Sequence, residues 1–263
     1  MDPDSRLRYV DIGDEPMIHL EPVRGYGNVP LMSLDMAVES LKPIIDILPS
    51  VCIAKQNCQH FHDNLTVDES AAIRLYTMQS LFKHLNEILR SKVRAELLRP
   101  WLPYLKLLLM ALYKLPSVKK TVWRGTNLDL STLYKQGDRC TWWGFSSCTE
   151  SITVADCFLG ECGSRTLFCI ECENGRLITQ YSQFGDENEI LLLPDFYFQV
   201  VDVRVRDGFP IIHVKEIQPP HRFLELPLSS NESVNCNLNS CISIKQKQPG
   251  IDGEQCHNLY LVS

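Results

Sequence analysis

The first half of the chain carries apolar residues at the three- and four-residue spacing of amphipathic helices. This spacing is clear between residues 33 and 48, where Pro43 predicts a break. Thr66-Val-Asp-Glu69 is a capping box, which predicts a helix that begins directly after Thr66. Two more helical runs lie at residues 81–89 and 105–112, and the second ends before Pro116. We therefore expect a helical N-terminal half.

From Lys120 onward, short runs rich in β-branched and aromatic residues replace the helical spacing. The predicted strands cover residues 121–123, 141–143, 166–172, 189–193, 198–205 and 210–215. Helices followed by strands predict an α+β fold rather than a doubly wound parallel sheet. We expect an irregular lead-in at residues 1–30, one domain at 31–225 and a flexible, Ser/Asn-rich tail at 226–263.

The composition is that of an ordinary globular protein, and the charge narrows the class of ligand. The 263 residues are 44% hydrophobic and 22% charged, with a formal charge of −6, which argues against nucleic acid as the main ligand. The longest apolar stretch, residues 105–113, is too short to cross a bilayer, so we expect no transmembrane segment. No apolar leader follows Met1, which indicates a cytoplasmic protein by default, or a secreted one if the N-terminus is incomplete.

Glu187 and Glu189 form an acidic pair at the start of a predicted buried strand. The turn-prone Phe184-Gly185-Asp186 leads into this pair and then into the apolar run 190–193. Strand side chains alternate between faces, so we expect both glutamates on one face, roughly 6–7 Å apart. Such a pair is typical of a cation site or of a site that acts on an electron-poor centre. The pair alone, however, favours a solvated acidic turn that leads into a strand, because charged groups are mostly exposed.

Two further segments carry candidate chemistry. Arg124 ends a predicted strand and precedes Gly125, which suits the binding of a phosphate or carboxylate, or else a surface arginine beside a turn. Residues 142–149 are predicted as an aromatic strand that runs into a cluster of small hydroxyl residues. If the strand persists, Ser147 and Thr149 share a face and can brace a carboxylate or a ribose. Turn chemistry is the alternative for these hydroxyls. No serine-hydrolase pattern surrounds them, which argues against nucleophilic catalysis.

Taken in order, these segments resemble the arginine–serine–glutamate class of mono-ADP-ribosyltransferases. The matching segments are Val122-Trp-Arg-Gly125, Phe145-Ser-Ser-Cys-Thr149, Tyr181-Ser-Gln-Phe184 and Glu187-Asn-Glu189. The resemblance covers roughly residues 50–218 and implies a helical N-terminal half packed on a mixed β-sandwich core that holds NAD in a cleft. The chain departs from the family at Cys148-Thr149, where Thr-Ser is more common.

The resemblance implies a role for each matching residue in transfer of ADP-ribose from NAD to arginine on a protein. Glu189 would stabilise the oxocarbenium-like ribose and bond its 2′-hydroxyl, and Ser147 would brace Glu189. Arg124 would hold the pyrophosphate, and Gly125 would offer its backbone to the nicotinamide amide. Glu187 would orient the acceptor guanidinium and help remove its proton, because a carboxylate pairs bidentately with arginine.

Three aromatic residues are weaker candidates, each with packing as the alternative. Phe158 would stack on nicotinamide, since the matching loop of the family carries an aromatic residue, but a core position fits it as well. Tyr181 and Phe184 would contact the protein substrate, unless they pack within their own loop.

Other readings of the sequence stay open or are weaker. An NAD glycohydrolase would use the same site with water as acceptor, and a non-catalytic module would use it to bind a nucleotide. A glycoside hydrolase needs carboxyl groups on both sides of the bond, which two residues of one strand face do not provide. We expect no metal, because Cys169 and Cys172 fall on opposite faces of a strand and Cys52, Cys58, His60 and His62 match no closed zinc spacing.

Overall fold

The helical runs predicted after Thr66 and at residues 81–89 and 105–112 correspond to helices in the structure. The computed structural model describes residues 15–59, 64–159, 164–185, 188–206 and 208–225, all within the first of the two units into which the chain divides. The helices are η2 (Tyr26–Asn28), α2 (Leu34–Ala37), η3 (Glu39–Leu41), α3 (Leu48–Asn57), α4 (Val67–Thr77), α5 (Gln79–Arg90), α6 (Arg94–Leu97), η4 (Arg99–Trp101), α7 (Leu102–Lys114) and α8 (Ile152–Leu159). None of these is long and apolar enough to cross a membrane.

Local signals in the sequence explain where two of these helices begin. The Thr66 hydroxyl accepts the Glu69 N–H at 3.2 Å, and the Glu69 carboxylate accepts the Thr66 N–H at 2.9 Å, so the capping box opens α4 as predicted. Pro43 lies in a turn between η3 and α3, which confirms the predicted break. The helix α3 was not predicted, because its apolar spacing is irregular.

The strands are β1 (Ser117–Thr126), β2 (Arg139–Trp142), β3 (Ser146–Thr149), β4 (Thr166–Leu177), β5 (Glu189–Leu192), β6 (Phe196–Arg206) and β7 (Phe209–Glu216). They follow the order β1-β3-β5-β4-β7-β6-β2, and β1 also pairs with β4, so that β1, β3, β5 and β4 form a ring of hydrogen-bonded neighbours. The pair β4–β7 is parallel and the other pairs are antiparallel. The predicted α+β fold with a mixed β core is therefore confirmed.

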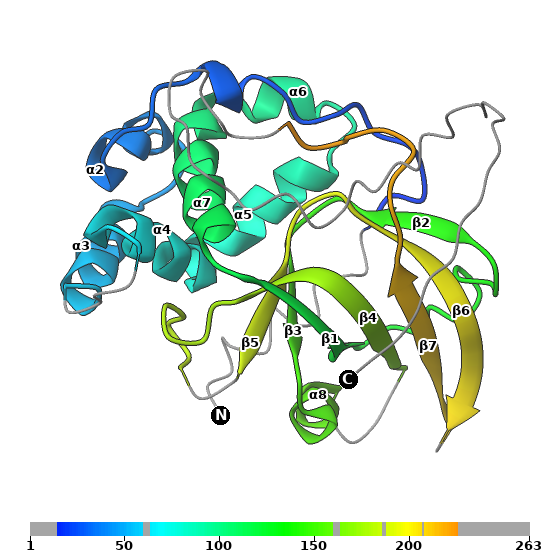
Figure 1. Cartoon of the computed structure of the whole chain (residues 1–263). Helices are drawn as coiled ribbons and strands as arrows, with labels where there is room; N and C mark the ends of the chain where they lie inside the picture. The colour runs from blue at the N-terminus through cyan, green and yellow to red at the C-terminus, as the bar shows by residue number, and fades with distance from the viewer. Residues whose placement is uncertain (1–14, 60–63, 160–163, 186–187, 207, 226–263) are drawn as a thin grey trace, which may run out of the picture. The chain divides into compact units, whose positions relative to one another are not determined.

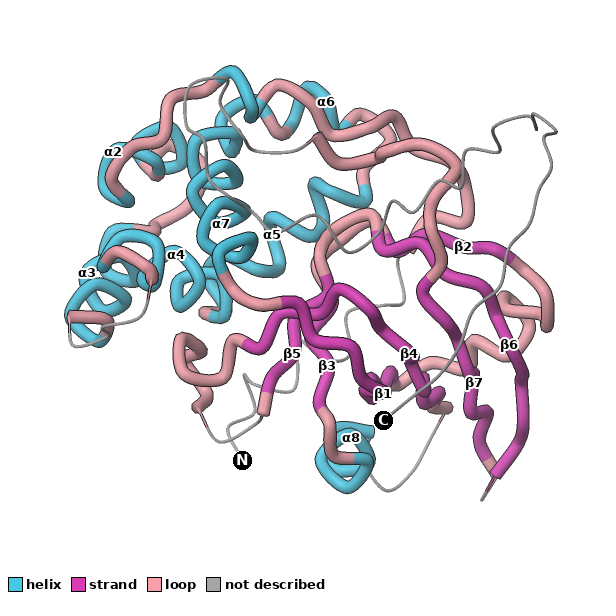
Figure 2. Tube along the Cα trace, in the orientation of Figure 1, coloured by secondary structure: helices cyan, strands magenta, loops and turns pink. Residues whose placement is uncertain are grey.

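Figure 1 shows α2–α7 gathered on one side of this core, with α8 apart from them beside β1 and β3. Figure 2 shows the long β6–β7 hairpin on the far side from the helices. Two hydrophobic clusters reflect this arrangement. Phe145, Tyr181 and Leu191 join the helices in one cluster, whereas Cys148 and Ile190 belong to the cluster on the other face of the sheet.

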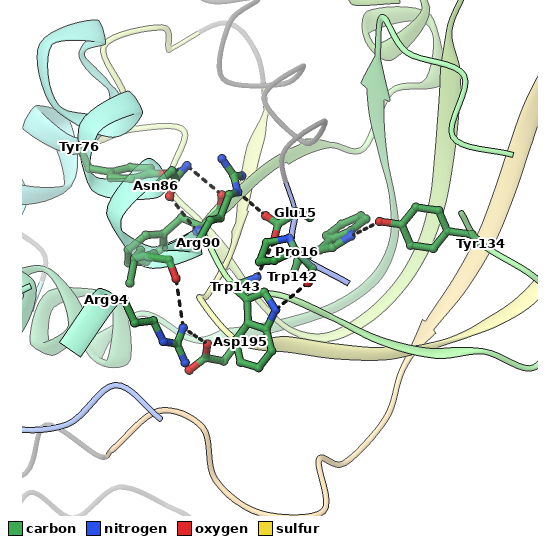
Figure 3. A network of polar contacts seen from close by, with 12 residues as sticks. Glu15, Pro16, Tyr76, Asn86, Arg90, Arg94, Tyr134, Trp142, Trp143 and Asp195 are labelled. Atoms are coloured by element: carbon green, nitrogen blue, oxygen red, sulfur yellow. Dashed lines mark hydrogen bonds and ion pairs between the residues drawn. The ribbon is translucent and has the colours of Figure 1, made fainter. Parts of the chain in front are cut away.

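The strand that contains the aromatic residues does not persist to Thr149 as one element. β2 ends at Trp142 and pairs with β6, whereas β3 begins at Ser146 and pairs with β1 and β5. The corner between them is held by polar contacts from the helices and from the N-terminal segment (Figure 3). Asn86 of α5 accepts the Phe145 N–H at 3.0 Å and donates to the Phe145 carbonyl at 3.2 Å, and Glu15 accepts the Trp143 N–H at 2.8 Å.

A buried ion pair extends this network toward β6. Arg94 Nη1 donates to Asp195 Oδ1 at 3.0 Å, and its guanidinium lies 4.7 Å from the centre of the Trp143 ring. Burial raises the pKa of Asp195 to about 6, against the opposing effect of Arg94. The helical half and the sheet are thus joined by polar contacts as well as by apolar packing.

Candidate active site

Three neighbouring strands contribute Arg124, Ser147 and Glu189. Arg124 lies on β1, Ser147 on β3 and Glu189 on β5, and β3 is the middle strand of the three. Each of these side chains is at most 1% exposed. Two interstrand spacings of about 4.8 Å separate the outer strands, so the three residues belong to one small region of the sheet. The structure therefore brings together three residues that the sequence singled out. Ser147 comes 23 positions after Arg124, and Glu189 comes 42 positions after Ser147.

The register of β3 and β5 places the hydroxyl residues on the face of Glu189. Thr149 is directly opposite Glu189, and Ser147 is opposite Leu191. Cross-strand partners share a face, so Ser147, Thr149 and Glu189 lie on the side that faces the helices. Cys148 is opposite Ile190 on the other face, as expected, and burial raises the pKa of its thiol, which keeps it protonated at neutral pH.

The carboxylate of Glu189 is held by a residue that the sequence did not single out. Ser182 Oγ donates to Glu189 Oε2 at 2.8 Å, and Ser182 is 2% exposed. The main-chain carbonyl of Glu189 accepts the Ile178 N–H at 3.0 Å, which ties the start of β5 to the segment after β4. The sequence signal that could have identified Ser182 is its place in Tyr181-Ser-Gln-Phe184, seven residues before Glu189.

Ser147 takes a different place from the one expected. Its hydroxyl is buried and forms no hydrogen bond within the part of the chain that the structure describes. Its main-chain carbonyl accepts a hydrogen bond from Arg124 Nη1 at 2.7 Å. In this structure, therefore, Ser147 orients the guanidinium of Arg124 through its carbonyl, and the Ser182 hydroxyl donates to the carboxylate of Glu189.

Thr149 connects the strand to the helix that follows. Its Oγ1 accepts the Ser151 N–H at 3.2 Å, which is the turn chemistry that the sequence left open for these hydroxyls. The following helix, α8, packs directly on β1: a Cβ atom added at Gly125 would lie 2.6 Å from Leu159 Cδ2. Gly125 is thus required for the close approach of α8. Phe158 lies on α8, but its side chain is outside the described part.

The segment before Glu189 differs from the expectation in two ways. Tyr181 is fully buried in the helical core, so it packs within the protein and offers no surface to a protein substrate, whereas Phe184 is half-buried. Glu187 lies outside the described residues. The expectation that it shares a face with Glu189 assumed a continuous strand, but β5 begins at Glu189 and Asn188 has a φ of 44°.

The last turn of α4 holds this segment in place. Arg74 Nη1 donates to the Ser182 carbonyl at 3.1 Å, and Thr77 Oγ1 accepts the Gln183 N–H at 2.8 Å. The Thr77 hydroxyl in turn donates to the Arg74 carbonyl at 2.7 Å. The helical half therefore does more than cover the sheet, because its contacts fix the position of Ser182, whose hydroxyl bonds Glu189.

The side chains of the types that bind metal ions do not cluster within the described residues. No group of three or more His, Cys, Asp or Glu side chains within them could hold a metal ion. Cys58 is buried, and burial raises the pKa of its thiol to about 11. Cys169 and Cys172 are both free thiols on β4, and His60 and His62 lie outside the described part.

Comparison with known proteins agrees with the fold. A model of the family "NAD:arginine ADP-ribosyltransferase" matches residues 36–220. The crystal structure of the eukaryotic mono-ADP-ribosyltransferase ART2.2 shares 18% identity with a TM-score of 0.54, covering 80% of this chain and 97% of its own. The ADP-ribosyltransferase HopU1 of Pseudomonas syringae pv. Tomato shares 20% identity with a TM-score of 0.51, covering 82% and 98%. A variant of ART2.2 in complex with NAD shares 18% identity with a TM-score of 0.54, covering 72% and 85%. No curated protein sequence matches the chain.

Proposed function

The chain belongs to the NAD:arginine ADP-ribosyltransferase family, and we propose that it transfers ADP-ribose from NAD to arginine side chains of a target protein. Family membership makes it an NAD-dependent ADP-ribosyltransferase, and NAD is its substrate. The observation that carries the proposal is the buried carboxylate of Glu189, which accepts a hydrogen bond from the Ser182 hydroxyl. Arginine as the acceptor rests on Glu187 and on the family resemblance.

The proposed chemistry follows from the charge that develops in the substrate. The bond between nicotinamide and ribose breaks with its electron pair leaving on nicotinamide, so positive charge builds on the ribose. A carboxylate aimed at this charge stabilises the transition state more than the ground state, and it does so strongly in a water-excluded site. Glu189 is suited to this role because it is 0% exposed and its orientation is fixed by Ser182.

Other residues suit the binding of the dinucleotide. The buried hydroxyl of Ser147 has no hydrogen-bond partner among the described residues, and a buried polar group of this kind fits a site that a polar ligand completes. Arg124, oriented by the Ser147 carbonyl, would take the pyrophosphate through its planar guanidinium. The backbone of Gly125 would bond the nicotinamide amide, and the ring of Phe158 would stack on it.

The burial of these side chains has a consequence for binding. Arg124, Ser147 and Glu189 are almost inaccessible to solvent, so NAD can contact them only if neighbouring segments of the protein move. Burial also explains how water is kept from the ribose cation while the acceptor approaches. In our proposal Glu187 binds the acceptor guanidinium and takes up its proton. Phe184 contributes to the surface that contacts the target protein.

The test is a paired measurement with NAD labelled in its adenylate part. Nicotinamide release is measured together with label incorporated into agmatine, an arginine analogue, and into the proteins of a cell extract analysed by mass spectrometry. We expect label on the guanidinium of agmatine and on arginine side chains. Nicotinamide release without label on any acceptor would show a glycohydrolase instead, and binding of NAD without either product would show a non-catalytic module.

A further inference from the structure

We propose that Ser182 is a positioning residue for Glu189, and that the last turn of α4 acts on the reaction through it. This inference rests on the proposed function, because it takes Glu189 as the catalytic carboxylate. The hydroxyl of Ser182 has a single proton, which it donates to Glu189 Oε2 at 2.8 Å. The same oxygen accepts the Phe184 N–H at 3.2 Å, which fixes the direction in which the proton points.

The backbone of Ser182 is held as firmly as its side chain. Its N–H donates to the Ile178 carbonyl at 2.9 Å, and its carbonyl accepts Arg74 Nη1 at 3.1 Å. The next N–H, that of Gln183, donates to Thr77 Oγ1 at 2.8 Å. Two elements, the turn after β4 and the helix α4, therefore fix the position of Ser182 independently of its hydrogen bond to the carboxylate.

Such a contact acts on the carboxylate by holding its direction. It removes one rotational freedom from a side chain that must point at a single atom of the substrate. The negative charge then stays aimed at the place where positive charge builds on the ribose. Loss of the contact should lower kcat, with little effect on the binding of NAD.

The first test compares three variants in the nicotinamide-release assay. Ser182→Ala should lower kcat about 10- to 100-fold, the range expected when a hydrogen bond to a charged group is lost, while KM for NAD stays within about threefold. Ser182→Thr keeps a hydroxyl and should recover most of the activity. Ser146→Ala removes a similarly buried hydroxyl that belongs to the opposite face of β3, and should leave both quantities unchanged.

The second test addresses the helix and does not depend on Ser182→Ala folding. Thr77→Val keeps the shape of the side chain but removes the oxygen that holds the Gln183 N–H, whereas Thr77→Ser retains it. Thr77→Val should lower kcat, as Ser182→Ala does, while KM for NAD stays within about threefold, and Thr77→Ser should leave kcat unchanged. An unchanged kcat in Thr77→Val would overturn the role of α4.

A double-substitution cycle separates this inference from the proposed function. In a Glu189→Gln background, Ser182→Ala should have little further effect, because the charge through which Ser182 acts is gone. Independent effects of the two substitutions would overturn the inference, as would a Ser182→Ala variant with wild-type kcat. Failure of Glu189→Gln itself to lower activity would instead overturn the proposed function, so the two failures are distinguishable.

Discussion

Thr149 of β3 and Glu189 of β5 are directly opposite each other in the antiparallel register. This pairing sets the face on which the carboxylate lies, because a slip by one residue would move Glu189 to the opposite face, where Cys148 and Ile190 pack. The register is in turn fixed by the apolar residues of β5, which alternate between the two hydrophobic clusters. The position of the carboxylate is therefore a property of the sheet and not of a loop.

The first prediction concerns the charge of that carboxylate. Glu189→Gln keeps the shape of the side chain and its bond to Ser182 but removes the negative charge. We expect nicotinamide release and transfer to fall by on the order of 10²–10³, the effect of losing one preorganised electrostatic contact. Both products are measured by chromatography, with a thermal melt to show that the variant is folded. Release near the wild-type rate would remove Glu189 from the catalytic role.

Arg124 gives the second prediction, which concerns binding. Arg124→Lys keeps a positive charge but loses the planar fork of donors and the fixed geometry of the bond to the Ser147 carbonyl. We expect the affinity for NAD to fall about tenfold or more, with the fold retained. Calorimetric titration measures the affinity of the two proteins. An unchanged affinity would exclude Arg124 from the NAD site.

The packing of α8 on β1 leads to the third prediction. A Cβ at position 125 would lie 2.6 Å from Leu159 Cδ2 and 2.8 Å from its Cγ, so in Gly125→Ala either the Leu159 side chain or α8 must shift. We expect a loss of about 1–3 kcal/mol in the free energy of unfolding, measured by denaturant titration. Leu159→Ala should offset part of that loss in the double variant. Strictly additive effects of the two substitutions would show that the methyl group added at position 125 and the Leu159 side chain are not in contact.

How far the sequence predicted the fold depends on how local each determinant is. The capping box at Thr66 and Glu69 joins residues three positions apart, and the break at Pro43 depends on one residue, so both were predictable. The corner after Trp142 was not, because its partners Asn86 and Glu15 are 59 and 128 positions away in the chain. A pattern of residue types does not show such contacts.

The same reasoning applies to the candidate site. Arg124, Ser147 and Glu189 were found from their residue types and order, and the structure places them on adjacent strands. The contact between Ser182 and Glu189 was missed although only seven positions separate them, because the path between them includes a left-handed Asn188. Tyr181 was assigned to the surface because its burial depends on helices more than sixty positions earlier.

Asp195 gives a fourth prediction, on stability and pH. Its pKa in the folded protein, about 6, lies above that of an ordinary aspartate, so the folded state binds the proton more tightly than the unfolded state. The contribution of Asp195 to stability is therefore greatest below pH 4 and declines as the pH rises to about 6. Asp195→Asn still accepts from Arg94 but does not titrate. The difference in unfolding free energy between the two proteins should change across this window, and a constant difference would contradict the prediction.

The last prediction separates transfer to arginine from hydrolysis of NAD, and it concerns Glu187, which lies outside the described residues. In the proposed mechanism Glu187 contacts the acceptor guanidinium and not the breaking bond. Glu187→Gln should therefore abolish transfer to agmatine while much of the slower nicotinamide release remains. The two rates are measured in the same reaction, with Glu189→Gln as the variant that should lose both. Equal loss of both activities in Glu187→Gln would assign Glu187 to bond cleavage, and retention of both would favour a glycohydrolase or an acceptor other than arginine.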